Sequence, residues 1–277
     1  MLTNHPVHLA KALLLTGALA AGSACSSVSQ EQEVQMGQQT AQQVNAQLPM
    51  LRDATVDAYI NSLGRTIAKT TSRADLDWHF AVVNSDVINA FALPGGFVYV
   101  NRGVISRASN ESELAGVLAH EIEHVVQRHS VKQMEQAQGA NIGVALTCAL
   151  TRVCENQAAQ AAIQVGGTAV FAKFSRGDER QADEGGFNNV IRAGLNPTGM
   201  LTFFEKLLAD EQNRGSANTS AWFSDHPGTQ DRIADIQRML NEMPASRRSG
   251  LRTDSQSFQN IRRRLGQLPA APRTPQR

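Results

Sequence analysis

The order of apolar and polar positions predicts a small β-sheet in the first half of the chain. Residues 77–84 alternate apolar and polar side chains, with Trp78, Phe80 and Val82 on one side, as in a half-buried strand. Residues 89–101 contain two short apolar runs separated by Pro-Gly-Gly, which is typical of a hairpin turn. We therefore expect three short strands that form a small antiparallel sheet.

In the rest of the chain, apolar residues recur every three or four positions, the spacing of helices with one buried face. We expect such helices over residues 53–70, 177–193 and 200–211, another that begins near Pro227, and a short amphipathic piece over residues 258–265. The most regular pattern starts at Asn110, which can cap a helix together with Glu113, and continues to about Lys132. The expected fold class is α+β and mostly α-helical.

The first 24 residues have the composition of a signal peptide. Lys11 precedes an apolar run, residues 12–22, that is too short to span a bilayer. Small residues then lead to Cys25, as in the bacterial motif whose cysteine receives a lipid. We expect residues 1–24 to be removed and Cys25 to carry a lipid anchor. Cleavage after Ala20, which would leave a soluble exported protein, is the alternative.

The remaining chain divides into a tether, one large domain and a tail. Residues 25–50 are rich in Gln and poor in apolar side chains, so we expect a lipid-anchored tether and then a polar helix. Residues 51–266 carry the predicted strands and helices of a single domain, and the Pro-rich residues 267–277 are expected to be disordered. Charged and amide side chains interrupt the apolar stretch 139–174, so we do not expect it to cross a membrane.

Charge and cysteine content narrow the class of protein. Lys and Arg number 26 against 25 Asp and Glu, and this balance gives no reason to expect nucleic acid as a partner. An export signal implies an oxidising compartment, in which Cys148 and Cys154 can form a disulfide. On one unbroken helix they would point in different directions, so a disulfide requires a break between them. The other interpretation is that Cys148 and Cys154 are two buried thiols that do not form a disulfide.

The most regular helix contains the sequence His-Glu-Ile-Glu-His. Residues four apart share one helix face, so the imidazoles of His120 and His124 can reach a single metal ion. Glu121 lies beside that face, where it can act as a base on metal-bound water. The motif also arises by chance, but these three side chains on a core-facing surface would be unfavourable without such a role. His129, nine residues after His120, is expected to point away and to be a helix-end or packing residue.

A hydrolytic zinc site usually has three protein ligands. Glu179 and Asp183 lie four positions apart on a later predicted helix. One of them can bind the metal while the other accepts a hydrogen bond from a ligating imidazole. Their spacing alone does not distinguish this role from that of a solvated helix face.

Four segments, in this order, resemble one family of zinc metallopeptidases, the gluzincins that include HtpX and the CAAX prenyl proteases. The segments are NAFALPGGFVYVNRGVI, ELAGVLAHEIEHVVQRH, FSRGDERQADEGG and FSDHPGTQDRI, and the resemblance extends from about residue 30 to residue 265. HExxH followed by ExxAD and a late His-Pro is far more specific than HExxH alone. The resemblance is strongest toward the periplasmic, lipid-anchored branch, and it implies a zincin-type domain whose active-site helix carries HExxH.

The resemblance also assigns roles by position. It implies one Zn²⁺ ion held by His120, His124 and Glu179, with Glu121 as the general base and Asp183 orienting a ligand. The histidine of Ser-Asp-His-Pro, His226, matches a loop residue that in some relatives covers the site. It is therefore a candidate for a self-inhibitory ligand and equally for stabilising an oxyanion. Arg232 matches an arginine that relatives keep near the site.

The implied function is that of a zinc-dependent endopeptidase in protein quality control. Its expected substrates are unfolded or misassembled envelope polypeptides, outer-membrane β-barrel proteins among them, at the periplasmic side of the outer membrane. The alternative is a chaperone-like assembly factor whose zinc site is latched and largely inactive. A redox role is disfavoured because the chain lacks a CxxC sequence. The sequence gives no prediction of the oligomeric state.

Overall fold

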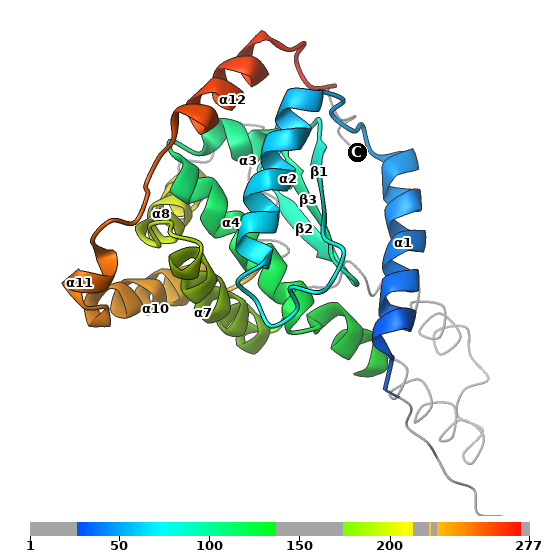
Figure 1. Cartoon of the computed structure of the whole chain (residues 1–277), viewed down its shortest axis with the longest axis horizontal. Coiled ribbons are helices and arrows are strands. Elements are labelled where there is room, and N and C mark those ends of the chain that lie inside the picture. Colours follow the sequence, from blue (N-terminus) through cyan, green and yellow to red (C-terminus); the bar gives the residue numbers. More distant parts are fainter. Residues whose placement is uncertain (1–26, 137–173, 213–221, 223–225, 273–277) are drawn as a thin grey trace, which may run out of the picture.

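A three-stranded sheet lies between helix α1 on one face and helices α2 and α4 on the other (Figure 1). The computed structural model describes residues 27–136, 174–212, 222 and 226–272. Residues 1–24, Cys25, Cys148 and Cys154 lie outside the described residues. The signal peptide, the lipid anchor and the disulfide therefore stay predictions.

The helices cover most of the described chain and agree in position with the apolar periodicity. In chain order they are α1 (Gln30–Gln47), α2 (Ala54–Ala68), α3 (Arg102–Arg107), α4 (Glu111–Val126), α7 (Arg176–Arg192), α8 (Thr198–Gln212), α10 (Thr229–Glu242), α11 (Ala245–Arg248) and α12 (Gln256–Gln267). The mostly helical α+β fold class is confirmed.

The sheet contains β1 (His79–Val83), β2 (Ala90–Leu93) and β3 (Phe97–Asn101) in the order β1-β3-β2. The expected hairpin is present, because β2 pairs with β3 in antiparallel orientation. The expectation of a wholly antiparallel sheet is wrong, because β1 pairs with β3 in parallel. The hairpin places β3, rather than β2, next to β1. Apolar alternation shows which face of a strand is buried, but it does not determine the order of strands.

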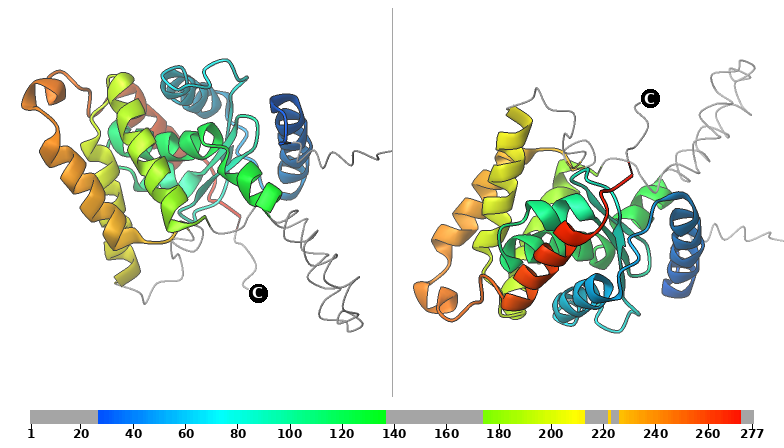
Figure 2. Two further views of the ribbon diagram at one scale, coloured as in Figure 1. Left: turned by 90° about the horizontal axis from the view of Figure 1, so that it is seen from below. Right: turned by 90° about the horizontal axis from the view of Figure 1, so that it is seen from above.

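Helix α1 covers the sheet face opposite to α2 and α4 (Figures 1 and 2). It is the polar helix expected within residues 25–50, and it begins with a capping box at Ser29. Its Ala41 and Val44 are buried against Leu93 and Tyr99 of the sheet. The amphipathic pattern of α1 is weak because only this narrow stripe is apolar, yet the helix is packed along the sheet.

Helix α4 occupies the centre of the molecule, against the sheet and against α2, α7 and α8 (Figure 2). All its residues except Val126 are buried. It begins as predicted, with the side chain of Asn110 accepting a hydrogen bond from the backbone of Glu113 at 3.1 Å. It ends earlier than predicted, because Arg128 has a φ of 57° and breaks the helix. Helical structure resumes at His129.

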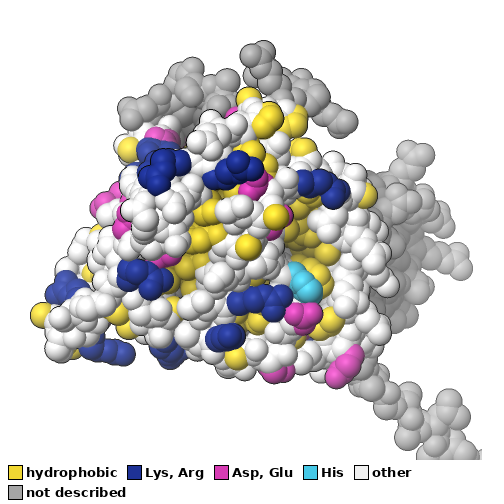
Figure 3. All heavy atoms as spheres, turned by 45° about the horizontal axis from the view of Figure 1, so that its top comes forward, with side chains coloured by type: hydrophobic (Ala, Val, Ile, Leu, Met, Phe, Trp, Pro, Cys, Tyr) yellow, Lys and Arg dark blue, Asp and Glu magenta, His cyan; other side chains and the backbone are white. Residues whose placement is uncertain are grey.

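The C-terminal helix is held to the domain by arginine side chains. Arg264 pairs with Asp53, the N-cap of α2, at 2.8 Å, and Arg102 donates to the carbonyl of Leu265 at 2.6 Å. Arg102 also reaches the carbonyl of Pro269, which lies in the segment expected to be disordered. On the face in Figure 3, Lys and Arg side chains are spread out rather than gathered into one patch. Within the described ranges, no helix has the length and apolar character needed to cross a membrane.

Candidate metal centre

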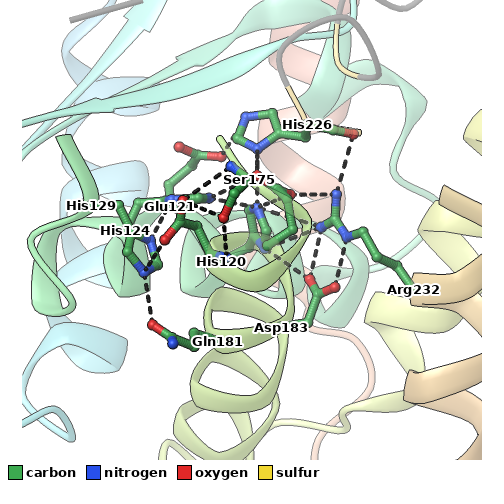
Figure 4. Close-up of polar contacts among 11 residues, drawn as sticks. His120, Glu121, His124, His129, Ser175, Gln181, Asp183, His226 and Arg232 are labelled. Carbon is green, nitrogen blue, oxygen red and sulfur yellow. Dashed lines mark hydrogen bonds and ion pairs between the residues drawn. The ribbon is translucent and has the colours of Figure 1, made fainter. Parts of the chain in front are cut away.

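The centre begins with two histidines one turn apart on α4. His120 and His124 are both buried, and their Nε2 atoms lie 3.0 Å apart (Figure 4). This geometry follows from the helix itself, because side chains at positions i and i+4 lie one above the other on the same face. The surrounding core keeps both rings in an environment with little water.

Helix α7 supplies the carboxylate. The Oε2 of Glu179 lies 3.4 Å from Nε2 of His120, and its Oε1 lies 3.4 Å from Nε2 of His124. Two glycines permit this approach: a Cβ atom at Gly185 would lie 2.3 Å from the Glu123 carboxyl carbon, and one at Gly186 would lie 3.1 Å from the backbone nitrogen of His120. Small residues at this contact therefore position the third predicted ligand.

His226 joins the same cluster from the segment that precedes α10. Its Nδ1 lies 3.2 Å from Nε2 of His120 and 3.0 Å from Oε1 of Glu179. The ring of His226 stacks on the buried indole of Trp222, with the ring centres 4.2 Å apart. One donor atom from each of four residues, His120, His124, Glu179 and His226, lies within 4.8 Å of the others.

The four donors fit a zinc ion. Tetrahedral zinc with bonds of about 2.0–2.2 Å separates neighbouring donor atoms by about 3.3 Å. In five of the six residue pairs the donor atoms lie 3.0–3.4 Å apart, with Glu179 using Oε2 toward His120 and Oε1 toward His124 and His226, and one donor atom from each residue lies within 4.8 Å of the others. Imidazole nitrogen with one carboxylate is also a donor set that suits zinc. If all four residues bind, no coordination position is left for water or substrate.

Asp183 and Arg232 form a buried pair behind the donors. Nδ1 of His120 lies 2.9 Å from Oδ1 of Asp183, so the second ring nitrogen of this candidate ligand is held by a carboxylate. Arg232 donates through Nε and Nη2 to both oxygens of Asp183, at 2.7 and 2.8 Å. A further guanidinium nitrogen lies 2.6 Å from Glu179. Arg232 therefore connects the two α7 carboxylates and limits their rotation.

Glu121 lies at the edge of the cluster with a buried carboxylate. Both of its oxygens are without a hydrogen bond from any described residue, and Oε1 lies 3.5 Å from Nε2 of His226. Burial raises the pKa of Glu121. A buried carboxylate with free lone pairs beside a metal site can accept a proton from water.

The charges of the cluster also favour a cation. Burial acts to raise the pKa of Glu179, but His226, Arg232 and His120 outweigh burial and hold that pKa well below its ordinary value. Burial lowers the pKa of His120, but Glu179 and Asp183 reverse this effect and bring it to about 9. Three buried carboxylates, those of Glu121, Glu179 and Asp183, face the single guanidinium of Arg232, so a bound metal ion can take the place of the proton that the carboxylates favour on His120.

His129 lies closer to the centre than the sequence suggested. A continuous helix would have turned it away, but after the break at Arg128 its Nδ1 lies 2.9 Å from Nδ1 of His124. Its Nε2 lies 3.1 Å from Oε1 of Gln181 (Figure 4). The expectation that His129 points away is therefore wrong, although His129 lies outside the four-donor set. Neither Gln181 nor Trp222 carried a signal in the sequence.

Comparison with known proteins gives the same family as the motifs. The model of Peptidase family M48 matches residues 54–240. The chain is 36% identical over 228 residues to the Beta-barrel assembly-enhancing protease of Escherichia coli, which covers 80% of this chain and 46% of that protein. It is 30% identical over 227 residues to the Mitochondrial metalloendopeptidase OMA1 of Schizosaccharomyces pombe, covering 80% and 65% of the two chains. It is 29% identical over 164 residues to the Metalloprotease LoiP of Escherichia coli, covering 59% and 63%.

The first of these relatives is about twice as long as the matched region. The family match, by contrast, covers well over half of this chain and includes all of α4, α7 and α8 together with His226. The chain therefore belongs to peptidase family M48.

Proposed function

We propose that this protein is a zinc-dependent endopeptidase with Glu121 as its general base. The observation that carries the proposal is the buried set of His120, His124, Glu179 and His226, whose donor atoms lie within 4.8 Å of one another. Membership of a metallopeptidase family supports it. Outside such a role, this group of buried polar side chains would destabilise the core.

The residues around the donors have distinct tasks in this proposal. A zinc ion bound here would supply a Lewis acid for the scissile carbonyl and would acidify water. Glu121 accepts the proton of the attacking water and passes it to the leaving amine. Asp183 accepts a hydrogen bond from Nδ1 of His120 and so keeps the Nε2 lone pair directed at the donor cluster. Arg232 holds Asp183 and Glu179 in these orientations.

His226 is proposed to act as a latch, by which we mean a protein ligand in the position that substrate requires. Its Nδ1 lies among the donors, and its ring stacks on Trp222. Its backbone carbonyl lies 3.5 Å from Nη1 of Arg232. In this state the enzyme is self-inhibited, and movement of His226 would open the fourth position. Oxyanion stabilisation is the alternative role, which would apply once the ring has moved aside.

The proposed substrates are unfolded or misassembled envelope proteins. Support comes from the name of the Escherichia coli relative, which refers to β-barrel assembly, and from the signal-peptide-like composition of residues 1–24, which precede Cys25. Strand β2 is an edge strand, so an extended polypeptide can add to it by backbone pairing. We propose a location at the periplasmic side of the outer membrane, through a lipid on Cys25, with soluble periplasmic protein as the alternative.

A second candidate function is chaperone-like assembly of outer-membrane proteins with a largely inactive zinc site. The observation that favours it is that His226 completes a four-donor set. A site closed in this way binds metal as a structural zinc site does. The intact Glu121 favours the peptidase.

Glu121→Gln tests the proposed base. The amide has nearly the same volume, so we expect normal zinc content and a loss of casein cleavage of about 10²–10⁴-fold. Zinc content is measured by metal analysis, and casein cleavage is measured with and without a chelator. Glu184→Gln, an exposed change on α7, is the control. Cleavage by Glu121→Gln at the wild-type rate would remove the base assignment.

His226→Ala distinguishes the latched peptidase from the chaperone-like factor. We expect zinc to remain bound by the other three donors and casein cleavage to rise about tenfold, which corresponds to about 1.4 kcal/mol of preference for the closed state. A variant that binds zinc and still shows no cleavage favours the chaperone-like function. Reduced cleavage with normal zinc content favours the oxyanion role.

A further inference from the structure

Helix α1 inserts one buried carboxylate into the domain. Glu33 has no exposed surface, although most of α1 is polar and solvated. Its Oε1 accepts from Nη1 of Arg73 at 2.8 Å and from the backbone nitrogen of Gly95 at 3.1 Å. Its Oε2 accepts from Nη2 of Arg73 at 3.1 Å and from Nε of Arg128 at 2.8 Å. Glu33 therefore joins α1 to the β2–β3 turn and to the end of α4.

The two arginines that meet Glu33 determine how α4 ends. Arg73 donates to the carbonyl of Val125, one residue after His124, at 3.0 Å. Arg128 is the one non-glycine among the described residues with a positive φ, and an L-residue adopts that conformation only against a steric cost. Its guanidinium also donates to the carbonyl of Val28, just before α1. Contacts with residues 28–33 thus hold Arg128 in the conformation that breaks the helix.

The break brings His129 back onto His124. Nε2 of His129 faces two acceptors, Oε1 of Gln181 at 3.1 Å and Oδ1 of Asp178 at 3.5 Å, so this nitrogen carries the hydrogen. In the neutral ring, Nδ1 is then an acceptor. It lies 2.9 Å from Nδ1 of His124, which therefore donates. With its hydrogen on Nδ1, His124 presents a lone pair at Nε2, the atom that faces the donor cluster.

We propose that His129 is a positioning residue for the metal ligand His124, and that helix α1 holds it there through the Glu33–Arg128 pair. This role rests on the zinc site proposed above, and it makes α1 one of the parts of the chain that assemble that site. The two α4 histidines are oriented by different groups: Asp183 accepts from His120, and a neutral imidazole accepts from His124. Loss of the α1 contacts therefore weakens zinc binding although α1 supplies none of the four donors.

The first experiment replaces His129 and measures zinc affinity by competition with a chromophoric chelator. His129→Phe keeps a ring of similar size but removes the acceptor, and we expect a 10–100-fold weaker zinc affinity. His129→Asn places a side-chain oxygen near the position of Nδ1, so we expect most of the affinity to return. A residue that only fills space would show the opposite order, because Phe is the better match in volume.

Histidine ring ¹H–¹⁵N spectra of the zinc-loaded protein give a second readout that does not depend on activity. We expect slowly exchanging Nδ1 protons on both His120 and His124 in the wild type. His129→Phe should lose the His124 signal and keep that of His120, while His129→Asn keeps both. Unchanged zinc affinity together with an unchanged His124 signal in His129→Phe would overturn the proposal.

The second experiment tests the connection to α1. Glu33→Gln removes the charge that Arg73 and Arg128 share, and Glu31→Gln is the matched control, because Glu31 lies exposed on the same helix. Arg128→Gln removes the guanidinium but keeps the steric cost of a φ of 57°. We expect weaker zinc binding in Glu33→Gln and Arg128→Gln, with Glu31→Gln equal to wild type.

Circular dichroism of each variant separates a folding defect from a local effect. Folded Glu33→Gln and Arg128→Gln proteins with wild-type zinc affinity would refute the role of α1. Wild-type protein that binds no zinc would instead refute the proposed function, so the two failures are distinguishable.

Discussion

At the residue scale, Arg232 connects most of the centre. It is buried, donates twice to Asp183, and lies within 2.6 Å of Glu179. A planar guanidinium can meet two carboxylates at once in fixed directions, whereas an ammonium group is a single point of charge. The charge of Arg232 therefore matters less than its shape, and a lysine cannot replace it.

Arg232→Lys tests this point. We expect a loss of about 3 kcal/mol in the free energy of unfolding, because one buried carboxylate is left poorly paired, together with weaker zinc binding. Urea unfolding with and without chelator measures the first effect. Arg238→Lys, on the same helix, changes a solvent-exposed pair with Asp235 and should have a much smaller effect, because water screens that pair. Equal effects of the two changes would contradict the argument.

At the element scale, the distance between α4 and α7 decides whether the ligands meet. His120 and His124 lie on α4 and Glu179 lies on α7, so the site exists only where the helix backbones come close. Gly186 lies at that contact, and a Cβ atom there would be 3.1 Å from the backbone nitrogen of His120 and 3.2 Å from the carbonyl carbon of Ala119. Backbone atoms in the buried centre of α4 cannot move aside as a flexible side chain can.

Gly186→Ala should therefore push α7 away from α4. We expect destabilisation of about 1–3 kcal/mol from overpacking and a measurable loss of zinc affinity. Gly177→Ala is the control on the same helix, where a Cβ atom meets nothing nearer than 3.5 Å. Better helix propensity should make that control neutral or stabilising by up to about 1 kcal/mol. Thermal unfolding and chelator competition measure the two effects, and a Gly186→Ala protein as stable as wild type would contradict the packing argument.

At the scale of the whole molecule, the centre joins segments that are distant in sequence. His120 and His226 are 106 positions apart, and Glu33 of α1 reaches Arg128 across 95 positions. The centre brings together buried carboxylates and imidazoles from α4, α7 and the segment before α10. Little water is present there to screen the interactions between their charges. Metal binding at such a site stabilises the folded state, since the unfolded chain does not present the donors together.

Metal removal should therefore lower the stability of the protein as a whole. At a free zinc concentration about a thousandfold above Kd, binding contributes about 4 kcal/mol, which for a domain of this size raises Tm by about 10 °C. Calorimetry with zinc and with chelator measures this shift. Zinc added back should restore the higher Tm, whereas magnesium should not, because it prefers oxygen ligands. A Tm that does not respond to chelator would contradict the coupling.

The sequence by itself determined the local features of this protein. Three features depend only on spacings of a few residues, which helix and turn geometry determine directly. They are the helix from Asn110, the shared face of His120 and His124, and the β2–β3 hairpin. Motif order also indicated the family, and through it the carboxylate at Glu179.

Only the tertiary structure decided the features that depend on distant contacts. The parallel pairing of β1, the place of His226 among the donors and the contacts of Arg232 with Asp183 and Glu179 follow from packing between segments that are distant in the sequence. The position of His129 shows most clearly why local spacing was not enough. In a continuous helix His129 would point away from His124. Glu33, 95 positions before Arg128, helps to hold the helix break at Arg128, and this break turns His129 back toward His124. Local periodicity describes a regular helix, and whether that helix continues is settled by what packs against its end.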